Sequence, residues 1–133
     1  MSVSSSDLLG LAKELAGADG ECCARAAVSR SYYALYHEAL AAAGILKLPQ
    51  CPADKKLATH ERLIYRYELA GRGLAALGRT IRKQKQMRAI ADYDIREEFR
   101  AGEAMLHIAN SERVLSDLRR ISQSETVGKG SPQ

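Results

Sequence analysis

The sequence predicts an all-α fold, an antiparallel up-down bundle of four to five helices. Apolar residues recur at helical spacing over most of the 133 residues, and alanine and leucine are abundant. The chain has one phenylalanine and no tryptophan, and its three prolines lie outside the periodic segments. This composition is typical of a helical bundle rather than a β-sandwich. We expect one helical domain over residues 1–121 and a disordered polar tail over residues 122–133.

The first two helices are predicted in the first third of the chain. Ser5 or Ser6 can cap the first helix, and the glycines of residues 17–20 end it. The second helix covers about residues 21–43 and ends at the following glycine. Its alanine and aromatic residues are typical of a central helix that is apolar nearly all round.

The remaining helices follow a loop. Residues 45–57 contain two prolines, which break any long helix there. The third helical region covers about residues 58–93, and Gly71 and Gly73 interrupt it, so we expect a kink or two separate helices. The last helix is predicted from about residue 95 to residue 121, where apolar residues again recur on one face.

A polar stripe interrupts the apolar second helix. Arg30, Tyr33 and His37 follow i, i+3 and i+7, so they share one side of the helix. Charged and titratable groups on such a helix need partners. Asp92 could pair with Arg30, or with Arg88 one turn before it. We expect these side chains to converge, either as a buried network that sets helix register or as a functional cleft.

A basic run is the best nucleic-acid signal in the chain. Five cations fall within ten residues: Arg79, Arg82, Lys83, Lys85 and Arg88. They would attract phosphate, and the attraction would fall steeply with salt. Aromatic residues do not interleave with the run, so stacking platforms for bases are lacking. The net charge of +4 and the pI of about 9.1 permit contact with nucleic acid or with an acidic partner.

Other chemistries find little support. Cys22, Cys23 and Cys51 are an odd count without metal-ligand spacing, which is typical of reduced thiols in the cytosol. No histidine pair has zinc spacing and no glycine-rich nucleotide loop is present, so we predict neither metal nor cofactor. No signal peptide is evident and no apolar stretch approaches the roughly 20 residues of a membrane span. We therefore expect a cytoplasmic protein with no membrane contact.

Three strings resemble motifs of the HEPN family (higher eukaryotes and prokaryotes nucleotide-binding). The first string contains Arg30, Tyr32, Tyr33, Ala34 and His37. The second contains Arg88, Ala91, Asp92 and Tyr93. Thr59 and His60 resemble the start of that family's third helix. Together the strings extend the resemblance over nearly the whole chain, from about residue 6 to residue 122.

The resemblance implies an HEPN-like bundle that forms a homodimer in a defence or toxin–antitoxin system. It also implies a partner such as a nucleotidyltransferase or another defence protein. Many HEPN proteins are metal-independent ribonucleases that carry an arginine followed a few residues later by a histidine. Six residues separate Arg30 from His37, and six separate Arg100 from His107. Thirteen arginines and three histidines make such pairs expected by chance, and no histidine closely follows the string at Arg88.

Three functions remain as alternatives. The first is a module that binds RNA, a nucleotide or a protein partner without catalysis of its own, through Tyr33, Arg82, Lys83, Lys85, Arg88, Asp92 and Tyr93. The second is a metal-independent ribonuclease toxin with Arg30 and His37 as catalytic residues. Histidine transfers protons near neutral pH, and arginine stabilises charge on phosphate. The third is a structural dimerisation scaffold.

Overall fold

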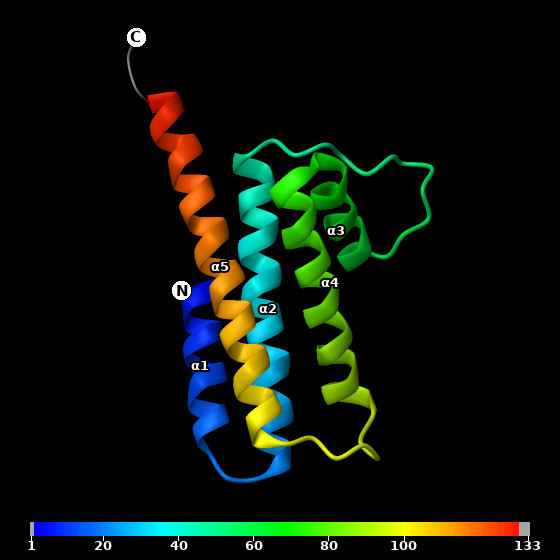
Figure 1. Cartoon of the computed structure of the whole chain (residues 1–133), viewed down its shortest axis with the longest axis vertical. Helices are drawn as coiled ribbons and strands as arrows, with labels where there is room; N and C mark the ends of the chain where they lie inside the picture. The colour runs from blue at the N-terminus through cyan, green and yellow to red at the C-terminus, as the bar shows by residue number, and fades with distance from the viewer. Residues whose placement is uncertain (1, 131–133) are drawn as a thin grey trace.

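The computed structural model describes the backbone of residues 2–130 and the side chains of residues 2–125, and this part of the chain is all-helical. The all-α prediction is therefore confirmed. Figure 1 shows the five helices of the described chain. They are α1 (Ser5–Gly17), α2 (Glu21–Ile45), α3 (Thr59–Ala70), α4 (Arg72–Tyr93) and α5 (Ala101–Gly130).

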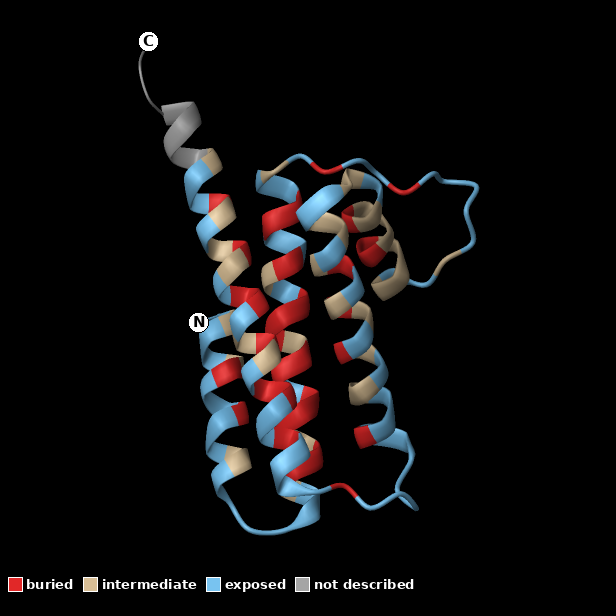
Figure 2. Ribbon diagram, in the orientation of Figure 1, coloured by how far each residue is buried: buried red, intermediate tan, exposed pale blue. Residues whose placement is uncertain are grey.

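Helix α2 is the centre of the fold, and the other four helices pack around it. Figure 2 shows buried residues along the whole of α2, whereas the outer sides of α1 and α5 are exposed. Alanines are buried on several sides of α2, among them Ala27, Ala34, Ala39 and Ala42. Their small side chains let neighbouring helices approach α2 closely, which explains why a helix so rich in alanine lies at the centre.

The direction of the helices departs from a strict up-down alternation at one connection. In the view of Figure 1, α1 and α4 run downward and α2, α3 and α5 run upward. The ring of His60 lies 4.3 Å from that of Tyr36, and the Tyr67 hydroxyl donates to the Ala39 carbonyl at 2.6 Å. Helices α2 and α3 therefore advance side by side in the same direction. Residues 46–58, with their two prolines, carry the chain back between them.

The helix ends correct several predicted boundaries. Helix α1 is capped by Ser4 rather than by Ser5 or Ser6: the Asp7 amide donates to Ser4 Oγ at 3.1 Å and the Ser4 amide donates to Asp7 Oδ2 at 2.9 Å. Helix α2 continues two residues past its predicted last residue, to Ile45.

Gly71 separates α3 from α4. Its φ of +74° lies in the left-handed region that favours glycine, so the chain turns there and two separate helices form. Gly73 lies inside α4 and does not interrupt it. Gly78 of α4 allows a close approach instead, because a Cβ there would lie 3.0 Å from Cβ of Tyr67.

The last helix begins later and continues further than predicted. Helix α5 starts at Ala101, and Phe99 is buried in the preceding loop rather than on the helix. The Phe99 amide donates to Glu21 Oε1 at 2.8 Å, and the Arg25 guanidinium lies 5.4 Å from the Phe99 ring centroid. These contacts fix the loop between α4 and α5 against the first turns of α2. The predicted disordered tail over residues 122–133 is helical as far as residue 130, and residues 131–133 lie outside the described residues.

Arg25 of α2 closes the C-terminal end of α4. Its Nη1 donates to the carbonyls of Ile90, Ala91 and Asp94 at 3.1, 3.0 and 3.0 Å, and its Nη2 donates to the Glu97 carbonyl. The last carbonyls of a helix have no partner within the helix and carry its negative dipole end, so a buried cation is stabilised there. Arg25 was not among the residues predicted to have a role.

None of the helices in the described part of the chain combines the length and apolar character needed to cross a lipid bilayer.

Candidate functional site

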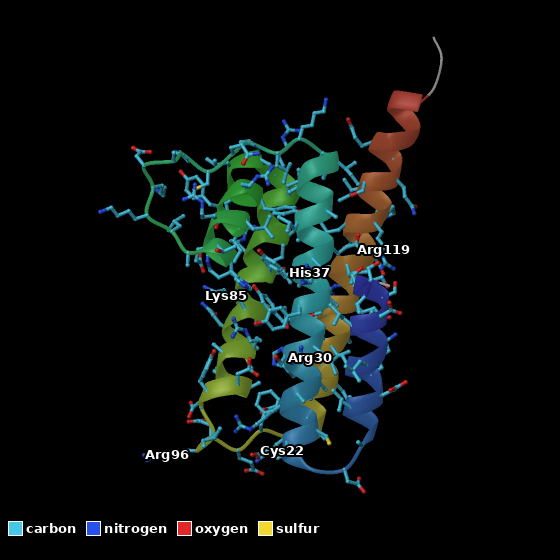
Figure 3. The ribbon with its side chains drawn as sticks, turned by 180° about the vertical axis from the view of Figure 1, so that it is seen from behind. Cys22, Arg30, His37, Lys85, Arg96 and Arg119 are labelled. Carbon is cyan, nitrogen blue, oxygen red and sulfur yellow. The ribbon has the colours of Figure 1, made fainter. Side chains whose placement is uncertain are left out.

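Helix α2 presents two of the predicted site residues to solvent. Figure 3 shows Arg30 and His37 on α2 beside Lys85 of α4. Arg30 and His37 are both exposed, and Tyr33 between them is half-buried. The Arg30 guanidinium carbon lies 5.9 Å from the Tyr33 ring centroid, and the His37 ring lies 5.4 Å from the Tyr36 ring. Arg30 and His37 therefore contact different tyrosines, with about 10 Å of helix rise between them.

Helix α4 brings a second guanidinium to the same tyrosine. The Arg88 guanidinium carbon lies 5.5 Å from the Tyr33 ring centroid and 5.7 Å from that of Tyr32. Arg88 Nη1 lies 3.5 Å from Asp92 Oδ2, and Ser29 Oγ donates to the same carboxylate oxygen at 3.2 Å. The structure thus brings Arg30 and Tyr33 of α2 together with Arg88 of α4, whereas His37 contacts Tyr36 instead. Asp92 pairs with Arg88 of its own helix, which was one of the two pairings considered.

Arg88 is not saturated by these contacts. Its side chain is 13% exposed, and its buried Nε has no hydrogen-bond partner among the described residues. A guanidinium carries five N–H donors, and the Asp92 carboxylate is the only ion-pair partner of Arg88 in the described chain. Nη2 makes no hydrogen bond or ion pair within the described residues, so it is the donor that remains for a ligand beside Tyr33, whereas Nε is enclosed by the protein.

His60 joins this cluster from the first turn of α3, and it was not among the predicted site residues. Its Nδ1 lies 2.6 Å from the Tyr32 hydroxyl, and its ring stacks on Tyr36. Burial, followed by the charges of Arg88 and Lys85, lowers the pKa of His60. The resemblance at Thr59 and His60 was the signal in the sequence, but contact with Tyr32 depends on how α2 and α3 pack.

The Tyr32–His60 hydrogen bond has one favoured arrangement of protons. Burial raises the pKa of the Tyr32 phenol, so the phenol keeps its proton near neutral pH. The lowered pKa of His60 favours the neutral imidazole. The Tyr32 hydroxyl therefore donates to Nδ1, and Nε2 carries the ring proton. We call Arg30, Tyr33, His37, His60 and Arg88 the tyrosine–histidine face.

The basic run of α4 does not form one surface. Arg82 Nη2 lies 3.2 Å from Glu61 Oε2 and also pairs with Glu68, and Lys85 Nζ lies 2.9 Å from Glu61 Oε1. The hydrogen bond from Lys85 is the largest cause that lowers the pKa of Glu61. Carboxylates of α3 therefore offset both of these cations. Lys83 is exposed and makes no ion pair within the described residues.

Lys83 also lies away from the tyrosine–histidine face. The pKa of His107 on α5 is lowered mainly by burial of the imidazole and next by the positive charge of Lys83. His107 is 7% exposed, whereas the side chain of Arg100 is 71% exposed, so this second arginine–histidine pair does not form an open site. Tyr93 is 77% exposed at the end of α4, beyond the contacts around Arg88.

The chemistry of the tyrosine–histidine face suits a phosphate beside an aromatic ring. Guanidinium groups bind phosphate through paired N–H donors, and tyrosine and histidine rings stack on bases. A neutral imidazole can also accept a proton. No group of three or more histidine, cysteine or carboxylate side chains that could hold a metal ion occurs among the described residues.

The surface of the described chain also has two cavities. One of about 320 Å³ lies between α1 and α5, and its lining includes Met105 and Ile108. The other, of about 210 Å³, lies between α2, α3 and the segment 46–58, and Tyr36 forms part of its wall. The second cavity is therefore next to the tyrosine–histidine face.

Comparison with models of known protein families, with curated proteins and with solved structures found no match to this chain.

Proposed function

We propose that this chain is an HEPN-like helical module whose tyrosine–histidine face binds RNA or a nucleotide without catalysis of its own. One observation carries the proposal: guanidinium groups from two helices, those of Arg30 and Arg88, lie 5.9 and 5.5 Å from the same Tyr33 ring. The proposed setting is a defence or toxin–antitoxin system, in which the chain acts as a homodimer with a nucleotidyltransferase or another defence protein as partner. The sequence resemblance supports this setting.

The charge around Tyr33 favours an anionic ligand. Asp92 offsets part of the charge of Arg88, while Arg30 makes no ion pair among the described residues. Arginine beside an aromatic ring binds single-stranded nucleic acid through phosphate contacts and stacking, without requiring a particular sequence. The half-buried ring of Tyr33 and the exposed ring of His37 supply the stacking surfaces that the basic run of α4 lacks.

RNA binding tests the proposal directly. Fluorescence anisotropy with a short single-stranded RNA should give saturable binding that weakens as salt is raised. Arg30→Gln and Arg88→Gln should each weaken the affinity by about tenfold, because each removes a phosphate contact at the same ring. Arg96→Gln is the matched control, since Arg96 is exposed in the loop that follows α4, away from Arg30 and His37 in Figure 3. Equal losses of RNA affinity in all three variants would show that RNA binds through general charge attraction and not at Tyr33.

A metal-independent ribonuclease is the second candidate, and the two histidines favour it. His37 is exposed, and the lowered pKa of His60 favours a neutral ring on the same face as two arginines. In such a reaction the 2′-oxygen attacks phosphorus and loses its proton to an imidazole. The bond from phosphorus to the 5′-oxygen breaks, and that oxygen takes a proton from an acid. Arg30 and His37 are the proposed catalytic residues.

Cleavage assays separate the candidates. Purified protein is incubated with total RNA in the presence of a chelator, and wild type is compared with Arg30→Ala and His37→Ala. Cleavage that both variants lose supports the enzyme. Binding without cleavage by the folded protein supports the binding module. A folded protein that neither binds nor cleaves RNA supports the dimerisation scaffold.

A further inference from the structure

The cavity between α2, α3 and the segment 46–58 has an unusual wall. Its volume is about 210 Å³, and its lining includes Tyr36, Leu40, Cys51, Thr59, Arg62 and Arg66. Figure 1 shows the segment arching away from α2 before it returns to the start of α3. The lining residues thus carry two guanidinium groups, two hydroxyls, the Gln50 amide and a thiol besides apolar carbon, and none of them carries a carboxylate.

Backbone carbonyls of the segment hold both guanidinium groups. Arg62 donates to the carbonyls of Lys55, Cys51 and Pro52 at 2.9, 3.3 and 3.3 Å. Arg66 donates through Nε and Nη2 to the carbonyls of Pro49 and Leu48, each at 3.2 Å. These carbonyl oxygens orient the two side chains but do not neutralise their positive charges. Arg62 Nε and Arg66 Nη1 donate to no oxygen in the described chain, so donors are left over in both groups.

Carboxylates of the two helices that line the cavity are engaged elsewhere. Glu61 accepts hydrogen bonds from Arg82 and Lys85 of α4. Glu38 accepts hydrogen bonds from Ser5 of α1 and Arg119 of α5. Neither Arg62 nor Arg66 forms an ion pair within the described residues, and the exposed Asp54 of the segment is adjacent to two lysines in the sequence. The local charge at the cavity is therefore positive.

We propose that this cavity binds a small oxyanion, and that a phosphate monoester is the class it fits best. Two guanidinium groups with spare donors match a doubly charged group better than a carboxylate. The volume is below the roughly 300–1,000 Å³ of pockets for drug-sized ligands, so the ligand is a phosphate with a small organic group. Helix α3 begins at the cavity wall, and its N-cap Ala58 supplies no side-chain hydrogen bond, so first-turn amides add to the positive potential.

This site is separate from the tyrosine–histidine face, and it does not depend on RNA binding there. Tyr36 lies between the two sites, since its ring lines the cavity and also stacks on His60.

Leu40 provides the test, because it lines the cavity and is 45% exposed while it takes no part in the arginine–carbonyl hydrogen bonds. Leu40→Glu places a carboxylate at the cavity, and Leu40→Gln is its uncharged match. Inorganic phosphate is titrated into the protein at constant ionic strength, and NMR follows the Nε–H signals of Arg62 and Arg66 and the Thr59 amide. We expect saturable shifts in wild type and Leu40→Gln, and an affinity lower by about tenfold or more in Leu40→Glu.

Acetate at the same concentrations supplies the comparison between oxyanions, and we expect it to bind more weakly than phosphate. Arg96→Gln controls for general charge and should bind phosphate as wild type does. The proposal is overturned if millimolar phosphate produces no saturable shift at these three residues, or if Leu40→Glu binds as tightly as Leu40→Gln. Acetate binding as tight as that of phosphate would overturn the choice of a phosphate monoester.

Discussion

Arg25 and Arg88 both lie where α2 meets α4, yet their surroundings are opposite. Arg25 is 7% exposed and donates to four carbonyls, two in the last turn of α4 and two in the loop that follows it. Arg88 has one ion pair of 3.5 Å and a buried Nε without a partner. The guanidinium of Arg25 donates its hydrogen bonds to backbone carbonyls of the protein itself. The guanidinium of Arg88 retains donors beside a tyrosine ring, so the comparison separates a cation that stabilises the fold from one that can bind a ligand.

The largest expected effect comes from the saturated arginine. Arg25→Met should lower the free energy of unfolding by about 3 kcal/mol, because it leaves the buried carbonyl of Ala91 and three part-buried carbonyls without their donor. Arg88→Gln should lower it by less, about 1 kcal/mol, since one ion pair of 3.5 Å and the contacts of the guanidinium with Tyr32 and Tyr33 are lost but no carbonyl loses its donor. Urea denaturation followed by circular dichroism measures both. Equal losses of stability in the two variants would contradict the distinction between Arg25 and Arg88.

Acid should destabilise the fold through His60. Burial and the charges of Arg88 and Lys85 lower the pKa of His60 below its usual value of about 6.5. Below that value the unfolded chain binds a proton that the folded imidazole does not, so stability falls as the pH drops from about 6.5 and is constant above it. Melting temperatures between pH 5 and 8 measure this loss. His60→Gln should make the melting temperature depend less steeply on pH.

Two controls sharpen the acid prediction. Burial also lowers the pKa of His107, so His107→Gln should remove a second part of the slope with the same sign. Arg88→Gln should raise the pKa of His60, as measured by NMR titration of its ring, while Arg25→Lys should leave it unchanged. A melting temperature that is constant from pH 5 to 7 would contradict the assignment of a neutral His60.

The smallest expected effect is at a cation that already has a carboxylate partner. Lys85 lies 2.9 Å from Glu61, so its charge contributes little to a ligand site. Lys85→Gln should weaken RNA binding by less than about threefold, against the about tenfold loss in Arg88→Gln. Anisotropy at one fixed salt concentration compares the two variants. A loss in Lys85→Gln as large as that in Arg88→Gln would show that Glu61 does not offset the lysine.

Local sequence signals predicted most helices but not the contacts between them. The glycines at residues 17–20 and at residue 71 ended helices as expected, because their effect is local. The loop before α5 was missed because Glu21 and Arg25, far away in the sequence, hold Phe99 there. The strict up-down alternation failed at α3, whose direction is set by packing and by the long segment before it.

The candidate site shows the same limit. The stripe on α2 and the string at Arg88 were visible in the sequence, and the structure places Arg30 and Arg88 around Tyr33 but His37 beside Tyr36. The role of His60 was not visible, because its contact with Tyr32 arises only when α2 and α3 pack in the same direction. An arginine such as Arg25 reads as a surface residue until its carbonyl partners are known.

The three histidines provide the most direct test of the tyrosine–histidine face. His37 and His60 lie on that face, whereas His107 is buried on α5. NMR of the histidine ring protons is recorded while a short single-stranded RNA is added at constant pH and salt. We predict that the signals of His37 and His60 shift in proportion to bound RNA while that of His107 stays in place. Bound RNA that leaves the signals of His37 and His60 unchanged would contradict the account.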